Sequence, residues 1–341
     1  MIYDLELKTP ITAQFSGQSV IDFLTDRFTY KSREQWLKLI DSGVISVNGE
    51  IVSKDYLLTE GSELCFIVPD YNEPDLDCNY HKVYENENII VVSKPANLPI
   101  TSNHRFFKQN MTALLRADEN LPEINPIHRI DRETSGLLIY LKKRFDSPKS
   151  LRKDPRSIMI DKYYLAVVRG EIASKKFTVN IPLIECNAQP IGYKIEAATK
   201  GTGKEASTEF NNLGTADGFT LLLAKLYSGR KHQIRAHCSL SGFPIVGDKL
   251  YSFESKYHLK KRNNETFTKN DYQELGAKHH LLHSFVLNLN LPNEGIKHII
   301  SEYFSDDFME YLKLFGKNAL EEAKQITSTG VLGVLPNVPY S

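Results

Sequence analysis

A short run of charged and polar residues at 128–136 carries the clearest sign of chemistry in the sequence. It reads His-Arg-Ile-Asp-Arg-Glu-Thr-Ser-Gly and places one carboxylate, Asp131, between Arg129 and Arg132. Neighbouring positive charge favours the ionised form of a carboxyl group. The Thr-Ser-Gly that follows predicts a turn, and the apolar run 137–141 predicts a buried strand behind it. An ionised aspartate on such a braced turn is suited to act as a nucleophile or as an electrostatic anchor.

Two tyrosines enter a second predicted strand, 163–168, directly after Lys162. Side chains alternate between the two faces of a strand, so Tyr163 and Tyr164 must point in opposite directions. Without other information, each would be taken as a core tyrosine.

A third run, 229–237, reads Gly-Arg-Lys-His-Gln-Ile-Arg-Ala-His. Helical spacing would place Lys231 and Arg235, four residues apart, on one face of a helix. By itself this pattern predicts a surface helix with a basic edge.

Taken together and in this order, the three runs resemble the motifs of RluA-type pseudouridine synthases. Those motifs are His-Arg-Leu-Asp-x-x-Thr-Ser-Gly-Leu, Lys-x-Tyr-Leu-Ala and Gly-Arg-x-His-Gln-Ile-Arg-x-His, with Ile130 here in place of the first leucine. Further matches at 203–208, 244–251 and 282–284 extend the resemblance over residues 83–290. It implies the pseudouridine synthase fold and an isomerase that converts uridine in structured RNA into pseudouridine with no cofactor and no metal.

The resemblance also implies roles for individual residues. Asp131 would be the catalytic residue, Arg235 its ion-pair partner, and Tyr164 the ring that faces the flipped uracil, while Arg129 fills the space that the base leaves. Asp131 would either attack the sugar or remove a proton, and the sequence leaves both open. Further RNA contacts are expected from Arg132, Lys162, Arg230, Lys231 and His232, and from Lys31, Arg33 and Lys38 near the N-terminus.

Other chemistries fit the residues less well. Residues 201–204 suggest a phosphate loop, but Glu205 stands where serine or threonine is required. Residues 279–283 have two histidines at the spacing of a zinc protease, but His280 takes the place of the catalytic glutamate. Glu133 could form a glycosidase-type pair with the aspartate two residues earlier, although that spacing does not assure the required separation. The remaining alternative is an RNA-binding or ribosome-assembly factor whose synthase domain does no catalysis.

Composition is that of a soluble globular protein with two domains. The 341 residues are 41% apolar, carry a net charge of zero, and contain no apolar run long enough to span a membrane. The four cysteines are scattered, which favours a reducing cytoplasm and argues against a zinc site. Charge is uneven: residues 1–70 carry a net charge of −5 and residues 142–169 a net charge of +6, with a second basic tract at 256–269. Phosphate contact is expected from the basic tracts.

The order of predicted elements suggests four segments. Residues 1–68 contain a helix–helix–hairpin pattern that resembles the RNA-binding module of the fourth small-subunit ribosomal protein (S-four-like below), with a capping box at Ser32 and Gln35. Residues 69–81 are predicted to be a linker, 82–315 the catalytic domain, and 316–341 a C-terminal tail that begins with a short helical pattern. Long segments between strands favour an α+β domain with a mixed, mainly antiparallel sheet. A monomer that binds rRNA, or else tRNA, is the expectation.

Overall fold

The computed structural model describes residues 1–103, 105–142, 151, 153–199 and 201–332. The chain folds into two compact units, Met1–Asp75 and a larger unit that begins at Leu76. Each unit has a hydrophobic core of its own. Within the described residues, no helix is long and apolar enough to cross a membrane.

The first unit is a four-stranded antiparallel sheet with two helices. In spatial order the strands are β1 (Ile2–Pro10), β4 (Glu63–Asn72), β2 (Ile45–Val47) and β3 (Glu50–Ile51), and the helices are α1 (Val20–Arg27) and α2 (Arg33–Asp41). The capping box predicted from Ser32 and Gln35 is present at the start of α2. Asn48 and Gly49 have φ angles of 50° and 87°, as a two-residue hairpin turn requires. The predicted helix–helix–hairpin order is confirmed.

The end of this unit differs from the predicted division into 1–68 and a linker at 69–81. Strand β1, which the sequence did not predict, pairs with β4 as far as Ile2 opposite Asn72. The pairing keeps β4 extended to Asn72 because a partner strand satisfies the backbone N–H and C=O groups of a polar segment. The residues between the last strand of the first unit and the first strand of the second are therefore 73–80.

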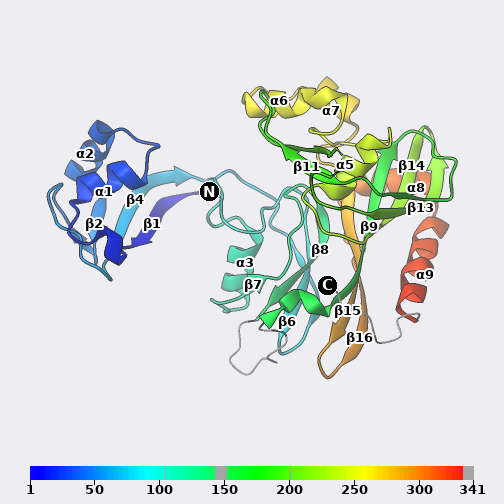
Figure 1. Ribbon diagram of the computed structural model, residues 1–341, viewed down its shortest axis with the longest axis horizontal. Helices are drawn as coiled ribbons and strands as arrows, with labels where there is room; N and C mark the ends of the chain where they lie inside the picture. Colours follow the sequence, from blue (N-terminus) through cyan, green and yellow to red (C-terminus); the bar gives the residue numbers. More distant parts are fainter. Residues whose placement is uncertain (104, 143–150, 152, 200, 333–341) are drawn as a thin grey trace. The chain divides into compact units, whose positions relative to one another are not determined.

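The second unit is built on a ten-stranded sheet (Figure 1). Its main path runs β10 (Lys176–Val179), β13 (Thr208–Ala216), β14 (Phe219–Leu226), β9 (Met159–Arg169), β15 (Leu282–Leu291), β8 (Ser135–Leu141), β6 (Ile89–Lys94) and β5 (His81–Glu85). Strand β16 (Gly295–Ile300) pairs with β15, and β7 (Asn125–Pro126) pairs with β8. Among the described strands, β15 and β8 form the one parallel pair. The predicted α+β fold with a mixed, mainly antiparallel sheet is confirmed.

Strands β6 and β8 form a rigid support inside the second unit. Every residue of both strands is buried. Val91 and Ile139 pack into one core cluster, whereas Val92 and Leu138 pack into another. A strand that is covered on both faces needs an unbroken apolar run, which is what the sequence 137–141 provides.

Helices and one separate hairpin cover the sheet. They are α3 (Met111–Asp118), α5 (Gln233–Leu240), α6 (Lys256–Arg262), α7 (Lys269–Leu275), α8 (Asp306–Phe315), α9 (Asn318–Leu332) and the hairpin of β11 (Leu183–Cys186) with β12 (Lys194–Ala197). Both α8 and α9 lie against β13 (Figure 1).

The segment 316–341, predicted as a short helical pattern followed by a tail, contains helix α9 at 318–332. Ala319, Ala323 and Thr327, spaced four residues apart, are all buried. An apolar stripe of this spacing stabilises a helix when a sheet covers it. Residues 333–341 lie outside the described part of the chain.

Candidate active site

Asp131 lies on a tight turn that leads into β8. The backbone N–H of Thr134 donates to the carbonyl oxygen of Asp131 at 3.1 Å and closes the turn. Gly136 follows with a φ of 95°, and a Cβ atom at this position would collide with the backbone of Ser284 in β15. Glycine is needed here because it alone permits this φ and so close an approach of two backbones. The Thr-Ser-Gly sequence thus places the turn directly against β15.

Arg235, in the first turn of α5, lies between two carboxylates. Its Nη1 donates to Oδ2 of Asp131 at 2.8 Å, and its Nε and Nη2 donate to Oδ2 and Oδ1 of Asp248 at 2.7 and 2.9 Å. Asp248 is fully buried and also accepts the backbone N–H groups of Leu250 and Tyr251. The ion pair expected between Asp131 and Arg235 is present. Asp248 belongs to the matched run 244–251, but the sequence assigned it no role.

The charges around Asp131 keep it ionised. Burial raises the pKa of this carboxyl, but the guanidinium of Arg235 is the main group that lowers it, and the pKa lies below its ordinary value. The pKa of Asp248 is lowered in the same way, since the effect of Arg235 outweighs that of burial. About a quarter of the Asp131 side chain, 24%, remains exposed, whereas Asp248 is closed off from solvent. Asp131 is therefore a carboxylate with one accessible edge.

His232 lies beside the catalytic candidate. Its Nε2 is 3.8 Å from Oδ1 of Asp131, and its Nδ1 is 3.1 Å from the hydroxyl of Tyr251. The Tyr251 hydroxyl accepts a hydrogen bond from the N–H of Ile195 at 3.0 Å, so the hydroxyl hydrogen is free to be donated to Nδ1 of His232. Nδ1 then acts as an acceptor, and neutral His232 carries its proton on Nε2, which faces Asp131. Burial lowers the pKa of His232 to about 4, and the histidine is neutral at neutral pH.

Tyr163 and Tyr164 are adjacent in β9, so their side chains point to opposite faces of the sheet, as predicted. Burial raises the pKa of Tyr164 to about 12, and the negative charge of nearby Asp131 adds to that rise. Tyr163 lies under the ammonium group of Lys225, 5.3 Å from its ring centre, on the other face. Tyr164 therefore keeps its proton at neutral pH and lies near enough to Asp131 for the charge of that carboxylate to affect its pKa.

Arg132 and Lys94 hold the backbone of the turn. Lys94 is fully buried and donates from Nζ to the carbonyl oxygens of Pro95 and Arg132 at 2.8 and 2.9 Å. Arg132 donates from Nε to the carbonyl oxygen of Asn97 at 3.0 Å, and its guanidinium lies 4.3 Å from the ring centre of Phe106. Sequence reasoning missed Lys94, although its place directly before a proline at the end of a buried strand was visible.

Two buried histidines anchor the hydroxyls of the turn. Thr134 Oγ1 lies 2.8 Å from Nε2 of His280, and Ser135 Oγ lies 2.8 Å from Nδ1 of His283. These contacts give His280 and His283 hydrogen-bonding roles that need no metal. In the described ranges, no group of three or more His, Cys, Asp and Glu side chains could hold a metal ion.

Glu133 ties the turn to α6. Its carboxylate forms ion pairs with Lys249 at 3.0 Å and with Lys261 at 2.7 Å. Elsewhere on α6, Lys260 pairs with Asp271 at 2.6 Å. Lys260 and Lys261, which belong to the second basic tract at 256–269, thus form ion pairs within the protein.

Lys231 does not share a helix face with Arg235, and that prediction is wrong. Helix α5 begins at Gln233, and His232 before it has a left-handed φ of 54°. The left-handed residue breaks the helical spacing, so Lys231 lies before the helix, exposed, with its ammonium 2.9 Å from Glu185 of β11.

The remaining residues predicted to contact RNA vary in exposure. The exposed ones are Arg33, Lys38, Arg129 and Arg230, and the half-buried ones are Lys31 and Lys162. Arg33 forms an ion pair with Asp22 at 2.7 Å. Within the basic tract 142–169, four of the basic positions, Lys143, Arg144, Lys149 and Arg152, lie outside the described residues.

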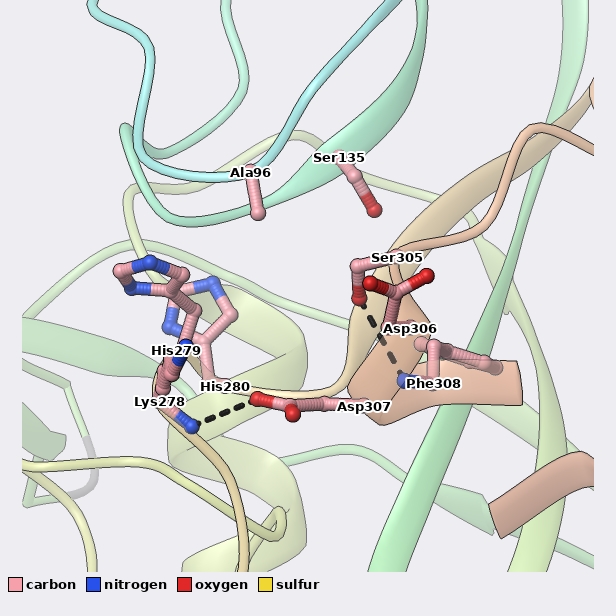
Figure 2. Close-up of a pocket in the computed structure, with 9 residues that line it drawn as sticks. All are labelled: Ala96, Ser135, Lys278, His279, His280, Ser305, Asp306, Asp307 and Phe308. Atoms are coloured by element: carbon pink, nitrogen blue, oxygen red, sulfur yellow. Dashed lines mark hydrogen bonds between the residues drawn. The ribbon is translucent and has the colours of Figure 1, made fainter. Parts of the chain in front are cut away.

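A pocket of about 140 Å³ lies next to the turn (Figure 2). Ser135 and Ala96 line one side of it, and residues 278–280 and 305–308 line the rest. In Figure 2 the backbone N–H of Lys278 donates to Asp307 at the start of α8, at 2.8 Å. Because neither Asp131 nor the other predicted catalytic residues line it, this pocket backs the turn rather than holding the reacting group.

Comparison with known proteins identifies the family. Residues 88–240 match the family model described as RNA pseudouridylate synthase. A protein of Aquifex aeolicus named as an uncharacterized RNA pseudouridine synthase is 30% identical over 246 residues, which cover 68% of this chain and 76% of that protein. The chain belongs to the RluA-type family of RNA pseudouridylate synthases.

Two further comparisons set the extent of the similarity. RNA pseudouridine synthase 7 of rice is 28% identical over 258 residues, which cover 74% of this chain and 65% of the rice protein. The chain thus spans slightly less than two thirds of that relative. The solved structure of human RNA Pseudouridylate Synthase Domain Containing 1 shares the fold, with a TM-score of 0.54, 21% identity, and coverage of 74% of this chain and 98% of that one.

Proposed function

We propose that this protein is an RNA pseudouridine synthase that isomerises uridines in structured RNA. One observation carries the proposal: an ionised, partly accessible Asp131 is held by Arg235, which Asp248 anchors in turn, and Asp131 is near enough to Tyr164 for its charge to raise the pKa of that tyrosine. The array lies on a scaffold whose family is established by sequence. It contains a carboxylate, a cation that orients it, and an aromatic ring.

The reaction needs no co-reactant. The bond from ribose C1′ to uracil N1 breaks, the detached base turns, and C1′ bonds to uracil C5, which loses its proton while N1 gains one. Asp131 acts either by attacking C1′ or by removing a proton, and both roles need the carboxylate that Arg235 keeps ionised. Tyr164 supports the detached base as a protonated phenol ring. The uridine must leave its base stack to reach this site, at a cost of a few kcal/mol.

We assign RNA contacts to basic residues around the site. Arg129 and Arg230 are exposed and so are accessible to phosphate groups. Arg129 is proposed to enter the space that the flipped base leaves. Lys162, although half-buried, lies on the same strand as Tyr164, two residues earlier and therefore on the same face.

The first unit is proposed to be an S-four-like module that adjusts the choice of target. Its order of helices and hairpin supports this, and Lys31, Arg33 and Lys38 lie in α2 or directly before it. We propose rRNA as the first candidate substrate and tRNA as the second. The protein is further proposed to act in the cytoplasm as a monomer without a cofactor.

The test is the substitution Asp131→Asn. Purified protein is incubated with total RNA from cells that lack the gene, and pseudouridines are mapped and counted. We expect the wild-type chain to modify specific uridines and Asp131→Asn to lose turnover while it still binds RNA, since the change is nearly isosteric. Asp217→Asn, on an exposed turn with a φ of 52° that asparagine also adopts, is the matched control. Turnover that survives in a folded Asp131→Asn protein would refute the assignment, and a wild-type chain that only binds RNA would favour a non-catalytic factor.

A further inference from the structure

Tyr193, the last residue of the loop between β11 and β12, presents a half-exposed aromatic ring beside the site. Its relative exposure is 45%. The ammonium group of Lys231 lies 5.0 Å from the centre of the ring. The rings of His232 and His258 meet it edge-on, at centroid distances of 6.5 and 5.5 Å. The ring is therefore supported by its neighbours while much of its surface remains open to solvent.

The ring is connected to the catalytic candidate through one residue. His232, which the ring of Tyr193 contacts, places its Nε2 3.8 Å from Asp131. One side chain, that of His232, thus separates Tyr193 from Asp131. A separation of this size can be spanned by two neighbouring nucleotides of one RNA strand.

The hairpin that carries Tyr193 is fixed in place although it is not part of the large sheet. The backbone N–H of Ile195 donates to the hydroxyl of Tyr251 at 3.0 Å, and Arg262 of α6 donates to the carbonyl oxygen of Pro190. A rigid aromatic side chain on a fixed hairpin loses little conformational entropy when a base stacks on it. The ring of Tyr193 is thus suited to recognise a base.

We infer that Tyr193 is a stacking platform for a nucleotide next to the target uridine, and that Lys231 contacts the phosphate of that nucleotide. The inference rests on the proposed synthase function and extends it, because it names a residue that selects the sequence context. Aromatic rings accept any base by stacking, and a neighbouring ammonium group adds a phosphate contact.

Lys231 is available for this contact. Its ion pair with Glu185 at 2.9 Å joins side chains that are 46% and 45% exposed, and a pair of this kind contributes little to stability. A phosphate with a full negative charge can replace the glutamate. The ammonium then moves by a short distance from one acceptor to the other while the ring stays in place.

The experiment is a cycle between protein and RNA variants. The probe is a synthetic stem–loop that carries a uridine modified by the full-length chain, together with versions in which each nucleotide flanking that uridine is abasic. The proteins are the wild type, Tyr193→Ala, Tyr193→Trp and a matched control, Tyr227→Ala. Tyr227 is also exposed, at 58%, and also lies near a lysine, with the Lys225 ammonium 5.4 Å from its ring centre, but it lies on the side of Tyr163.

We expect Tyr193→Ala to raise the KM for the intact stem–loop by about tenfold or more, with a smaller change in kcat. Tyr193→Trp should retain tight binding, and Tyr227→Ala should behave as the wild type. At one flanking position, the abasic RNA should bind the wild type more weakly than the intact RNA does. Tyr193→Ala should bind these two RNAs equally, because the protein change and the RNA change remove the same contact.

Two results would overturn the inference in different ways. If the wild type modifies the RNA but Tyr193→Ala loses the same factor on every probe, Tyr193 only supports the hairpin, and the stacking role is wrong. If Tyr193→Ala equals the wild type on all probes, the stacking role is likewise wrong and the synthase function stands. If the wild type forms no pseudouridine in any RNA, the proposed function itself fails.

Discussion

Replacement of Arg235 by alanine would leave two carboxylates, Asp131 and Asp248, without the guanidinium that lies between them. Asp248 is fully buried, so it cannot gain water in exchange. Breaking a buried ion pair by removing one partner costs about 3–5 kcal/mol. We expect the free energy of unfolding of the second unit to fall by about that amount at neutral pH. Turnover should fall by about a hundredfold or more, because Asp131 loses the contact that positions it.

The loss of stability in Arg235→Ala should depend on pH, and the pKa shifts of the two carboxyl groups give the direction of that dependence. In the wild type the pKa values of Asp131 and Asp248 are lowered, so this stabilisation is present above the ordinary carboxyl pKa of about 3.9 and is lost as the pH falls toward the lower folded values. In Arg235→Ala the largest effect that opposes burial is lost, so both pKa values should rise. The difference in stability between wild type and variant should therefore be largest at neutral pH and shrink at about pH 4.

The measurement is urea unfolding followed by far-UV circular dichroism at both pH values. Tryptophan fluorescence is unsuitable, because the chain has one tryptophan, Trp36, which belongs to the first unit. Arg230→Ala is the control, since Arg230 is exposed and its Nε bonds only a backbone carbonyl group, so its stability should change by no more than about 0.5 kcal/mol. A loss of stability in Arg235→Ala that is as small as in this control, or that does not shrink in acid, would refute the reasoning.

Four further outcomes are expected. Tyr164→Phe should keep RNA affinity and lose much of the turnover rate, and Tyr164→Ala should harm turnover more than Tyr163→Ala does; the reverse order would show that the wrong tyrosine was chosen. Gly136→Ala should destabilise the protein by about 2 kcal/mol or more in thermal unfolding, because its φ of 95° and the adjacent backbone leave no room for a Cβ. Activity on RNA that is folded without divalent ions should be the same in excess chelator, and a need for metal would contradict the proposed chemistry. RNA affinity should fall steeply with salt, and neutralising the basic tract 142–169 should flatten that dependence more than removing the residues before Leu76.

Local sequence patterns predicted the elements whose formation needs no distant partner. The capping box before α2 and the Asn48-Gly49 turn depend on residues three or fewer positions apart, and both are present. The opposite directions of Tyr163 and Tyr164 follow from the two-residue period of any strand. Strand β1 was missed, and α9 was predicted only as a short helical pattern, because each depends on a partner far away in the chain: β1 on β4, and α9 on β13.

The sequence by itself determined which residue we propose to carry the chemistry, because Asp131, its flanking arginines and the Thr-Ser-Gly turn are contiguous. Tertiary structure alone decided how that carboxylate is held. Arg235 binds Asp131 and Asp248 through three side-chain nitrogens, and Lys94 reaches the turn from the end of β6. Charge and hydrogen bonding act over a few ångströms in space, whatever the distance along the chain. A motif can therefore name the reacting group, while its pKa and orientation depend on residues that only the fold brings together.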